Sequence, residues 1–116
     1  MPSAQQRRPA AEQTPDRRRA VWMAHLLTER AFRAEQIEQL DRDVTSSSAP
    51  ARDTITKTLR DNAQAALREI DAALGRLLTG GFGRCLTCGQ AIDPVRLDVL
   101  PMAGRCTACQ YEAERS

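Results

Sequence analysis

Two Cys-x-x-Cys pairs constrain this chain more than any other feature of its sequence. All four cysteines lie in these pairs, Cys85/Cys88 and Cys106/Cys109, and residues 89–105 separate them. Two residues between cysteines allow a tight turn that points both sulfurs at one position, and two such turns close a tetrahedral four-thiolate site. The pattern therefore predicts one structural zinc ion per chain, held by all four cysteines.

Paired cysteines have three other common uses in proteins. Two disulfides would need an oxidising compartment, and nothing in the sequence indicates export. A redox Cys-x-x-Cys is usually a single pair at the start of a helix that follows a strand. An iron–sulfur cluster also takes four cysteines, so the number of cysteines alone leaves this alternative open.

The composition agrees with a small module that a metal stabilises. The chain has 116 residues, of which 41% are hydrophobic, many of them alanine, and 3% are aromatic. Such a chain cannot fill a large globular core, and small modules commonly need a metal. The formal net charge is +2, and four thiolates with one zinc ion would bring the loaded protein close to neutral. The charge therefore gives no case for strong nucleic-acid binding.

The N-terminal region contains no recognisable targeting segment. Its residues lack the apolar core of a signal peptide, and no apolar run in the chain is long enough to cross a membrane. We therefore expect a cytoplasmic protein whose reduced thiols are available for metal. Residues 1–13 are polar, contain two prolines and are expected to form a disordered tail. The basic residues near this end, expected to be solvated, are Arg7, Arg8, Arg17, Arg18 and Arg19.

Two long amphipathic helices are predicted before the cysteines. Thr14-Pro15-Asp16 is typical of a helix start and predicts a helix over 15–44. A serine-rich loop over 45–49 follows. A second helix is predicted near 50–79, starting at Pro50 or at Asp53/Thr54 and ending at a glycine pair. The apolar residues recur every three or four positions, which predicts an antiparallel coiled-coil hairpin. The predicted stripes are Ala20, Met23, Leu27, Ala31, Ala34, Ile37, Leu40 and Val44, and Ile55, Leu59, Ala63, Ala66, Ile70, Leu74 and Leu77.

We therefore expect a mainly α fold: an antiparallel coiled-coil helical hairpin, then a small four-cysteine zinc-finger module with a short C-terminal helix. The expected boundaries are 14–80 for the hairpin, with its tip at about 42–50, and 81–116 for the module. Asp93-Pro94 predicts a short helix within the module. The residues expected to pack over the metal site are Phe82, Ile92, Leu97 and Leu100.

The C-terminal motif resembles the DksA/TraR family of four-cysteine zinc proteins. The resemblance covers residues 81–110 and includes Gly81-Phe82-Gly83, both cysteine pairs, Gly89, Ile92, Arg96-Leu97, Pro101 and Gln110. It implies a bacterial transcription regulator that binds RNA polymerase directly and inserts its hairpin into the secondary channel. Such factors modulate initiation, often together with the alarmone ppGpp. The resemblance implies neither catalysis by the factor itself nor direct sequence-specific DNA binding.

This sequence departs from the family pattern at two places. Family tips commonly carry Asp-x-x-Asp-x-Ala, whereas Val44 stands here where a second Asp would follow Asp41. Alarmone-responsive members tend to have a basic residue before the proline that corresponds to Pro101, and Leu100 occupies that position here. This leucine argues against cooperation with ppGpp. The candidate partner-binding residues at the tip are Asp41, Asp43, Val44, Thr45 and Ser46.

Two other classes of function compete with polymerase binding. The first is a zinc-stapled coiled-coil adaptor that binds another protein through the rod, without a direct effect on transcription. The second is a nucleic-acid-binding zinc ribbon, which lacks an aromatic series for base stacking. An enzyme is not expected, because a closed four-cysteine site leaves no open metal position. The basic residues of the ribbon interpretation are Arg84, Arg96 and Arg105, and the acids that offset them are Asp93, Asp98, Glu112 and Glu114.

The single tryptophan and the single histidine lie close together in the first predicted helix. Trp22 is expected to cover the neighbouring helix rather than to form an exposed binding anchor. His25 is expected to be an ordinary helix residue, because four cysteines already suffice for zinc.

Overall fold

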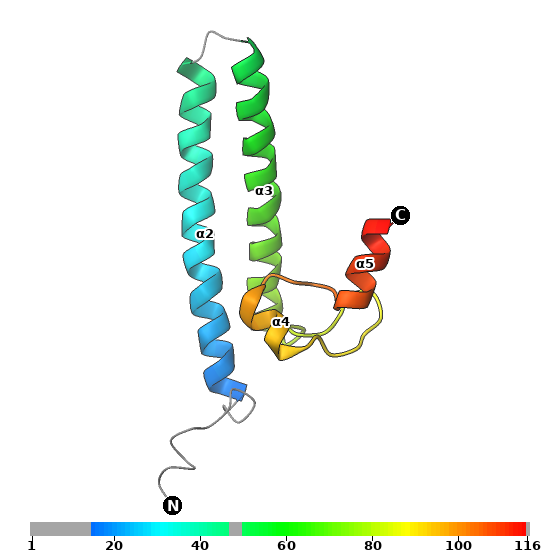
Figure 1. The fold of residues 1–116 in the computed structure, drawn as a ribbon. Coiled ribbons are helices and arrows are strands. Elements are labelled where there is room, and N and C mark those ends of the chain that lie inside the picture. The colour runs from blue at the N-terminus through cyan, green and yellow to red at the C-terminus, as the bar shows by residue number, and fades with distance from the viewer. Residues whose placement is uncertain (1–14, 47–49, 116) are drawn as a thin grey trace, which may run out of the picture.

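The computed structural model describes residues 15–46 and 50–115, which form the helices α2 (Pro15–Ser46), α3 (Pro50–Thr79), α4 (Pro94–Val99) and α5 (Thr107–Arg115). The helices α2 and α3 run antiparallel as a rod, and the cysteine loops, α4 and α5 lie beside its base (Figure 1). The molecule extends 66 Å along its longest axis and 35 and 25 Å along the others. This arrangement confirms the predicted fold class.

The ends of the long helices follow from their local sequences. The second predicted helix coincides with α3, whereas α2 continues two residues beyond the predicted end at Val44. After α3, Gly80 adopts a left-handed backbone with φ of +94°, which glycine allows without strain. The N–H groups of Gly80 and Gly81 both donate to the carbonyl oxygen of Arg76, at 2.9 and 3.0 Å. Residues 45 and 46 of the predicted loop belong to α2, and the rest of that loop, 47–49, lies outside the described residues, as does the predicted tail at 1–13.

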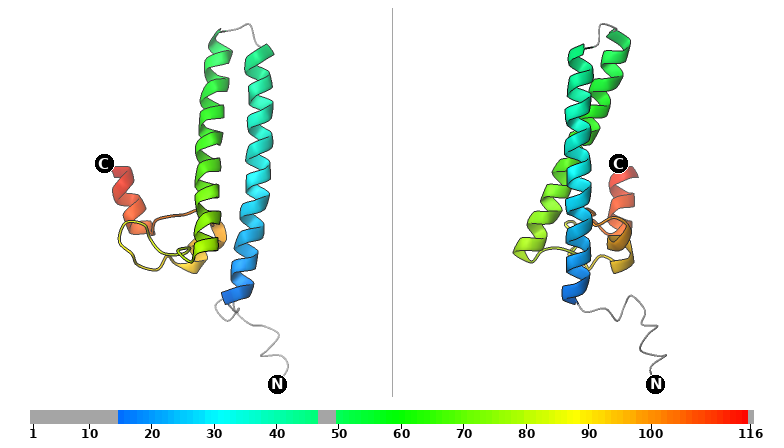
Figure 2. Two further views of the ribbon diagram at one scale, coloured as in Figure 1. Left: turned by 180° about the vertical axis from the view of Figure 1, so that it is seen from behind. Right: turned by 90° about the vertical axis from the view of Figure 1, so that its left-hand side faces the viewer.

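The seam between the two long helices has a seven-residue repeat on α3. Thr56, Ala63, Ile70 and Leu77 are all buried and lie seven positions apart. A seven-residue period is the signature of a coiled coil, in which one face of each helix stays turned toward the partner. The two helices cross at an angle when the rod is viewed from the side (Figure 2).

The predicted apolar stripes were right at some positions and wrong at others on both helices. Leu26 is completely buried, whereas the predicted Leu27 is 52% exposed. On α3, Thr56 occupies the seam and the predicted Ile55 is 64% exposed. Neighbouring positions on a helix differ by about 100° in direction, so contacts with the rest of the molecule must select between adjacent apolar residues. On α2 that contact comes from Trp22, which lies one turn before Leu26 and shares its face.

The core lies at the base of the rod, in two adjoining groups of side chains. One group joins the two helices and the other lies within the cysteine module, and Phe82 packs against both. The rod and the module are thus stabilised by one continuous apolar region. The first group comprises Leu26, Ile70, Ala73 and Leu77, and the second comprises Trp22, Cys85, Ile92 and Leu97.

Within the module, α4 forms as predicted, because the Asp93 side chain accepts a hydrogen bond from the Val95 N–H at 2.9 Å and caps the helix. Ile92 and Leu97 are buried beside the cysteines, as expected. Leu100 is 42% exposed, so its predicted packing over the metal site was wrong. It follows the last turn of α4, where its backbone has left the helical conformation. Across residues 15–46 and 50–115, no helix combines the length and apolar character needed to span a membrane.

Candidate metal centre

The first cysteine pair lies in a short loop that backbone hydrogen bonds hold closed. The N–H of Cys85 donates to the carbonyl oxygen of Gln90 at 2.8 Å, and the N–H of Ile92 donates to that of Gly83 at 2.7 Å. The tight turn between these bonds contains Gly89, whose φ of +77° requires the left-handed region. The loop thereby directs Cys85 and Cys88 toward the second pair.

The second pair lies at the start of α5. Cys106 immediately precedes the helix and Cys109 lies in its first turn, so the C-terminal helix includes the last cysteine. In each pair the N–H of the second cysteine lies 3.5 Å from the sulfur of the first. These N–H groups and the positive end of the helix dipole favour the thiolate form.

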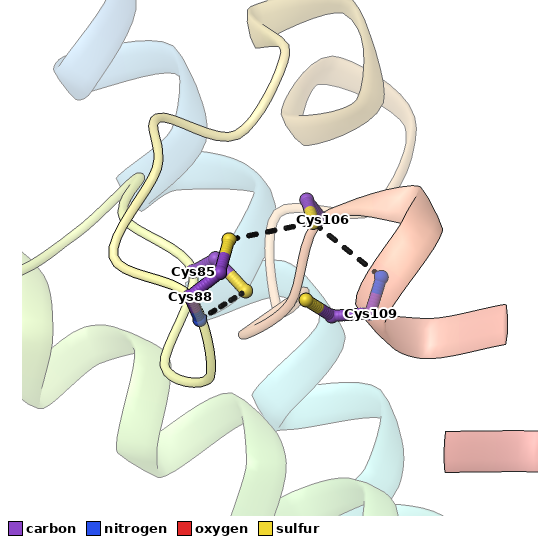
Figure 3. Close-up of side chains that lie close together, drawn as sticks. All are labelled: Cys85, Cys88, Cys106 and Cys109. Atoms are coloured by element: carbon purple, nitrogen blue, oxygen red, sulfur yellow. Dashed lines mark hydrogen bonds between the residues drawn. The ribbon is translucent and has the colours of Figure 1, made fainter. Parts of the chain in front are cut away.

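The four sulfur atoms form a group that fits one zinc ion. All four lie within 4.8 Å of one another, and the Sγ atoms of Cys88 and Cys106 are 3.9 Å apart. Zinc–sulfur bonds of about 2.3 Å in a tetrahedron place the sulfurs about 3.8 Å apart, so the donor set has the right size. Figure 3 shows the side chains converging from the loop and from α5. Cys85 is buried and Cys88 is exposed, so the site has one protein-covered and one solvent-facing side.

The thiols have different affinities for protons because their surroundings differ. Hydrogen bonds from backbone N–H groups, first that of Cys88 and then that of Cys106, lower the pKa of Cys85 to about 5. Neighbouring thiols, first Cys106 and then Cys85, raise the pKa of Cys109 to about 12. Four thiolates this close repel one another, and a bound divalent cation supplies the charge that lets all four ionise together.

Trp22 is buried and packs against the cysteine module, so it is not an exposed binding anchor, as expected, and the buried group it joins is that of the module. Its ring lies 5.1 Å from that of Phe82, centroid to centroid, and it packs in the same buried group as Cys85. Its indole N–H donates to the Asp98 carboxylate at 2.8 Å. The indole needs both an apolar surface and an acceptor, and the module provides both. The sequence carried no signal for this pairing, because 76 positions separate the two residues.

The three arginines of the nucleic-acid interpretation hold the module together. Arg84 donates to the Gly89 carbonyl oxygen at 2.9 Å, which closes the first cysteine loop. Arg96 donates to the carbonyl oxygen of Arg105 at 3.2 Å, and Arg105 donates to Thr87 Oγ1 at the same distance. Each guanidinium thus has a partner inside the module.

The candidate tip residues lie at the opposite end of the rod from the cysteines (Figure 1). Asp41 pairs with Arg60 of α3, with 2.5 Å between carboxylate Oδ1 and Nε. Asp43 Oδ1 accepts a hydrogen bond from the Gln39 side chain at 3.2 Å. Val44 is half-buried, and the side chains of Thr45 and Ser46 lie outside the described set.

Residues 80–115 match the family of prokaryotic dksA/traR C4-type zinc fingers. An uncharacterized protein of Aquifex aeolicus is 41% identical over 66 residues, which are 53% of this chain and 46% of that protein. The RNA polymerase-binding transcription factor DksA of Haemophilus influenzae is 38% identical over 55 residues, 47% of this chain and 38% of that one. The chain thus spans less than half the length of these two curated relatives.

The fold is similar to that of the transcription factor DksA2 from Pseudomonas aeruginosa. The TM-score is 0.76 at 25% identity, and the alignment covers 93% of this chain and 92% of the other. With the zinc-finger match, this confirms the resemblance to the DksA/TraR family. The segment 80–115 is a zinc finger of that family, and its four cysteines hold one zinc ion.

Proposed function

We propose that this chain is a transcription regulator that binds RNA polymerase and inserts its helical hairpin into the secondary channel to modulate initiation. The observation that carries the proposal is the joint presence of a dksA/traR zinc finger and a fold shared along almost the whole chain with a DksA2 transcription factor. A relative that matches 47% of this chain is named an RNA polymerase-binding transcription factor.

The shape of the rod supports this mode of binding. The 32 residues of α2 span about 48 Å at 1.5 Å per residue, and only one antiparallel partner accompanies them. A pair of helices can enter a narrow channel that excludes a globular domain. The cysteine module widens the molecule at the base (Figure 2) and would limit how far the rod enters.

The tip would carry the effect on the polymerase. Its two acids are exposed at the far end of the rod, where they would approach the basic residues or the metal ion near the polymerase active centre. Asp41 is fastened to Arg60 across the hairpin, which holds the tip of α2 beside α3. The residues assigned to this contact are Asp41, Asp43, Val44, Thr45 and Ser46.

We expect regulation without ppGpp. Leu100, which precedes Pro101, lines an open groove of about 600 Å³ between α3, α5 and the loop between α4 and α5. The groove lining carries both signs of charge, with Glu69 and Glu114 beside three arginines, so the expectation rests on Leu100 and not on the charge of the groove. A direct role in sequence-specific DNA binding is not part of the proposal, because Arg84, Arg96 and Arg105 serve the module itself.

The experiment that tests the proposal combines binding with crosslinking. Purified zinc-loaded protein should bind core RNA polymerase of its host and change the output of single-round transcription. A photo-crosslinking amino acid at exposed Asp43 should attach to the polymerase residues that line the secondary channel. The same amino acid at exposed Ala113 of α5 should attach elsewhere.

Two results would overturn the proposal at different levels. If no polymerase is bound, the partner assignment fails and the adaptor interpretation replaces it. If polymerase is bound but Asp43 crosslinks only outside the channel, the hairpin-insertion step fails while polymerase binding stands.

A further inference from the structure

We propose that Asp98 is a positioning residue that locks the helical rod to the zinc module. Asp98 lies on α4, and both of its carboxylate oxygens are engaged by side chains of α2. This lock concerns the free protein and does not depend on polymerase binding.

The contacts at this lock come from two residues one helical turn apart. Trp22 Nε1 donates to Oδ1 of Asp98 at 2.8 Å, and Arg18 Nη2 donates to Oδ2 at 3.3 Å. The Arg18 guanidinium also lies 5.8 Å from the centroid of the Trp22 ring, within the range of a cation–π contact. The three side chains therefore hold one another in a closed set of contacts.

Burial makes this set sensitive to the loss of a single charge. The Arg18 side chain is only 13% exposed and Trp22 is 9% exposed, whereas Asp98 is 38% exposed. Removing one partner of a largely buried pair leaves the other charge poorly solvated. Asparagine at position 98 would keep an acceptor for the indole but would turn its amide donors toward the guanidinium, which has no acceptor to offer.

The connection between α3 and the module explains why a lock is needed. The chain leaves α3 through Gly80-Gly81, and Gly80 already adopts a left-handed backbone. A glycine pair has the widest backbone freedom available to a chain and would serve as a hinge. The Asp98 contacts attach α2 to α4 beside the apolar contacts of Trp22 and Phe82, and they add directional hydrogen bonds that restrict this freedom.

The lock also joins the rod to the metal centre. Trp22 packs in one buried group with Cys85, and the partly buried Cys106 and Cys109 pack against the same group. When the lock holds α2 in place, Trp22 covers the cysteines. When the metal site is formed, the cysteines in turn provide the surface against which Trp22 packs. Such coupling is reciprocal, so loosening the lock must weaken zinc binding by the same factor by which zinc tightens the lock.

A distance measurement tests the positioning role directly. Spin labels are carried by non-natural amino acids at exposed Asp61 of α3 and exposed Ala113 of α5. The distance between them reports how the module is placed relative to the rod. We expect one narrow distance distribution in the parent protein and a broad one in Asp98→Asn. The matched control is Asp71→Asn, which removes an exposed ion pair with Arg30 within the rod and should leave the distribution narrow.

Zinc competition with a chelator provides the second measurement. Asp98→Asn should lower zinc affinity about tenfold, a typical coupling between two sites, while Asp71→Asn should not change it. Trp22→Phe removes the indole N–H together with part of the ring surface. When Trp22→Phe and Asp98→Asn are combined, zinc affinity should fall by less than the product of the two separate fold-changes. Emission from the single tryptophan should shift to longer wavelength in Asp98→Asn.

Results of two kinds would overturn the inference. A narrow distance distribution in Asp98→Asn would mean that other contacts fix the rod. Independent, multiplicative effects of Trp22→Phe and Asp98→Asn on zinc affinity would mean that the two residues do not act as one set. Circular dichroism would reveal general unfolding of Asp98→Asn. In that case Arg18→Gln would be used instead, and it should likewise broaden the distance distribution and lower zinc affinity.

Discussion

Asp41 on α2 pairs with Arg60 on α3 across the hairpin, and the two charged atoms are 2.5 Å apart. One of the two candidate tip acids therefore also serves the structure of the rod. Both acids are exposed near the end of α2, where negative charge opposes the helix dipole at a cost of a few tenths of a kcal/mol. The ion pair with Arg60 offsets this cost for Asp41 and leaves its carboxylate partly open to solvent.

The tip acids should affect transcription more than binding. Asp41→Asn combined with Asp43→Asn removes two charges with little change in size, and each exposed charge contact is worth about 0.2–1 kcal/mol. We expect polymerase affinity within a few-fold of the parent, and loss or reversal of the effect on a responsive promoter. Competition binding and single-round transcription on one preparation measure both quantities.

The control for the tip is Arg60→Gln, which breaks the same ion pair but keeps both acids. It should regulate like the parent protein. If Arg60→Gln and the double variant lose regulation equally, the acids act through the rod's structure. If the double variant regulates normally, the acids are only a solvated helix end.

Loss of one metal ligand should release the zinc. Cys106→Ser should lower the zinc content from one ion per chain to near zero, because a structural site needs all four ligands. Since zinc binding contributes folding free energy directly, residues 81–110 should lose protection from hydrogen exchange before the rod does. Elemental analysis measures the metal, with Thr107→Ser as the neighbouring control. Iron in place of zinc, or full retention of zinc by Cys106→Ser, contradicts the assignment.

Zinc binding should weaken as the pH falls. The pKa of Cys109 is raised to about 12, so at any lower pH zinc must displace at least this proton, and affinity should fall at least about tenfold per pH unit. The pKa of Cys85 is lowered to about 5, so the fall should become steeper below that pH as this thiol also takes up a proton. Chelator competition between about pH 4.5 and 8 measures the slope, and an affinity independent of pH would contradict it.

Two adjacent leucines should differ sharply in their contribution to stability. Leu26 is fully buried between the helices, so Leu26→Ala should lower the free energy of unfolding by about 2–5 kcal/mol. Leu27 is 52% exposed, and Leu27→Ala should change it by about 0.5 kcal/mol or less. Urea unfolding of the zinc-loaded protein compares them. Equal losses would mean that the seam of α2 passes between the two positions.

A charge in the seam should unfold the rod, whereas the same charge on its surface should not. Ile70 is 1% exposed, and Ile70→Asp would bury a carboxylate without a partner, at a cost of more than about 4 kcal/mol. Ile55 is 64% exposed, so Ile55→Asp is the matched control and should remain folded. Circular dichroism and scattering distinguish an intact rod from a collapsed or unfolded chain. Equal tolerance of both variants would place Ile70 outside the seam.

Local signals in the sequence were sufficient to predict the helices and the metal ligands. Prolines at the helix starts and the glycine pair after α3 act within a few residues, so the extents of the long helices could be predicted almost to the residue. The Cys-x-x-Cys spacing likewise defines a turn on its own, and a closed four-thiolate site leaves few alternatives to zinc.

Only the tertiary structure decided which face of each helix is buried and what holds the rod to the module. Leu26 and Leu27 are chemically identical, and the choice between them depends on how α2 rests on a module that lies more than fifty residues away along the chain. The same holds for Trp22, whose partner Asp98 is separated from it by 76 positions. Periodicity describes a helix in isolation, whereas the rotation of that helix about its axis is set by the surface against which it packs.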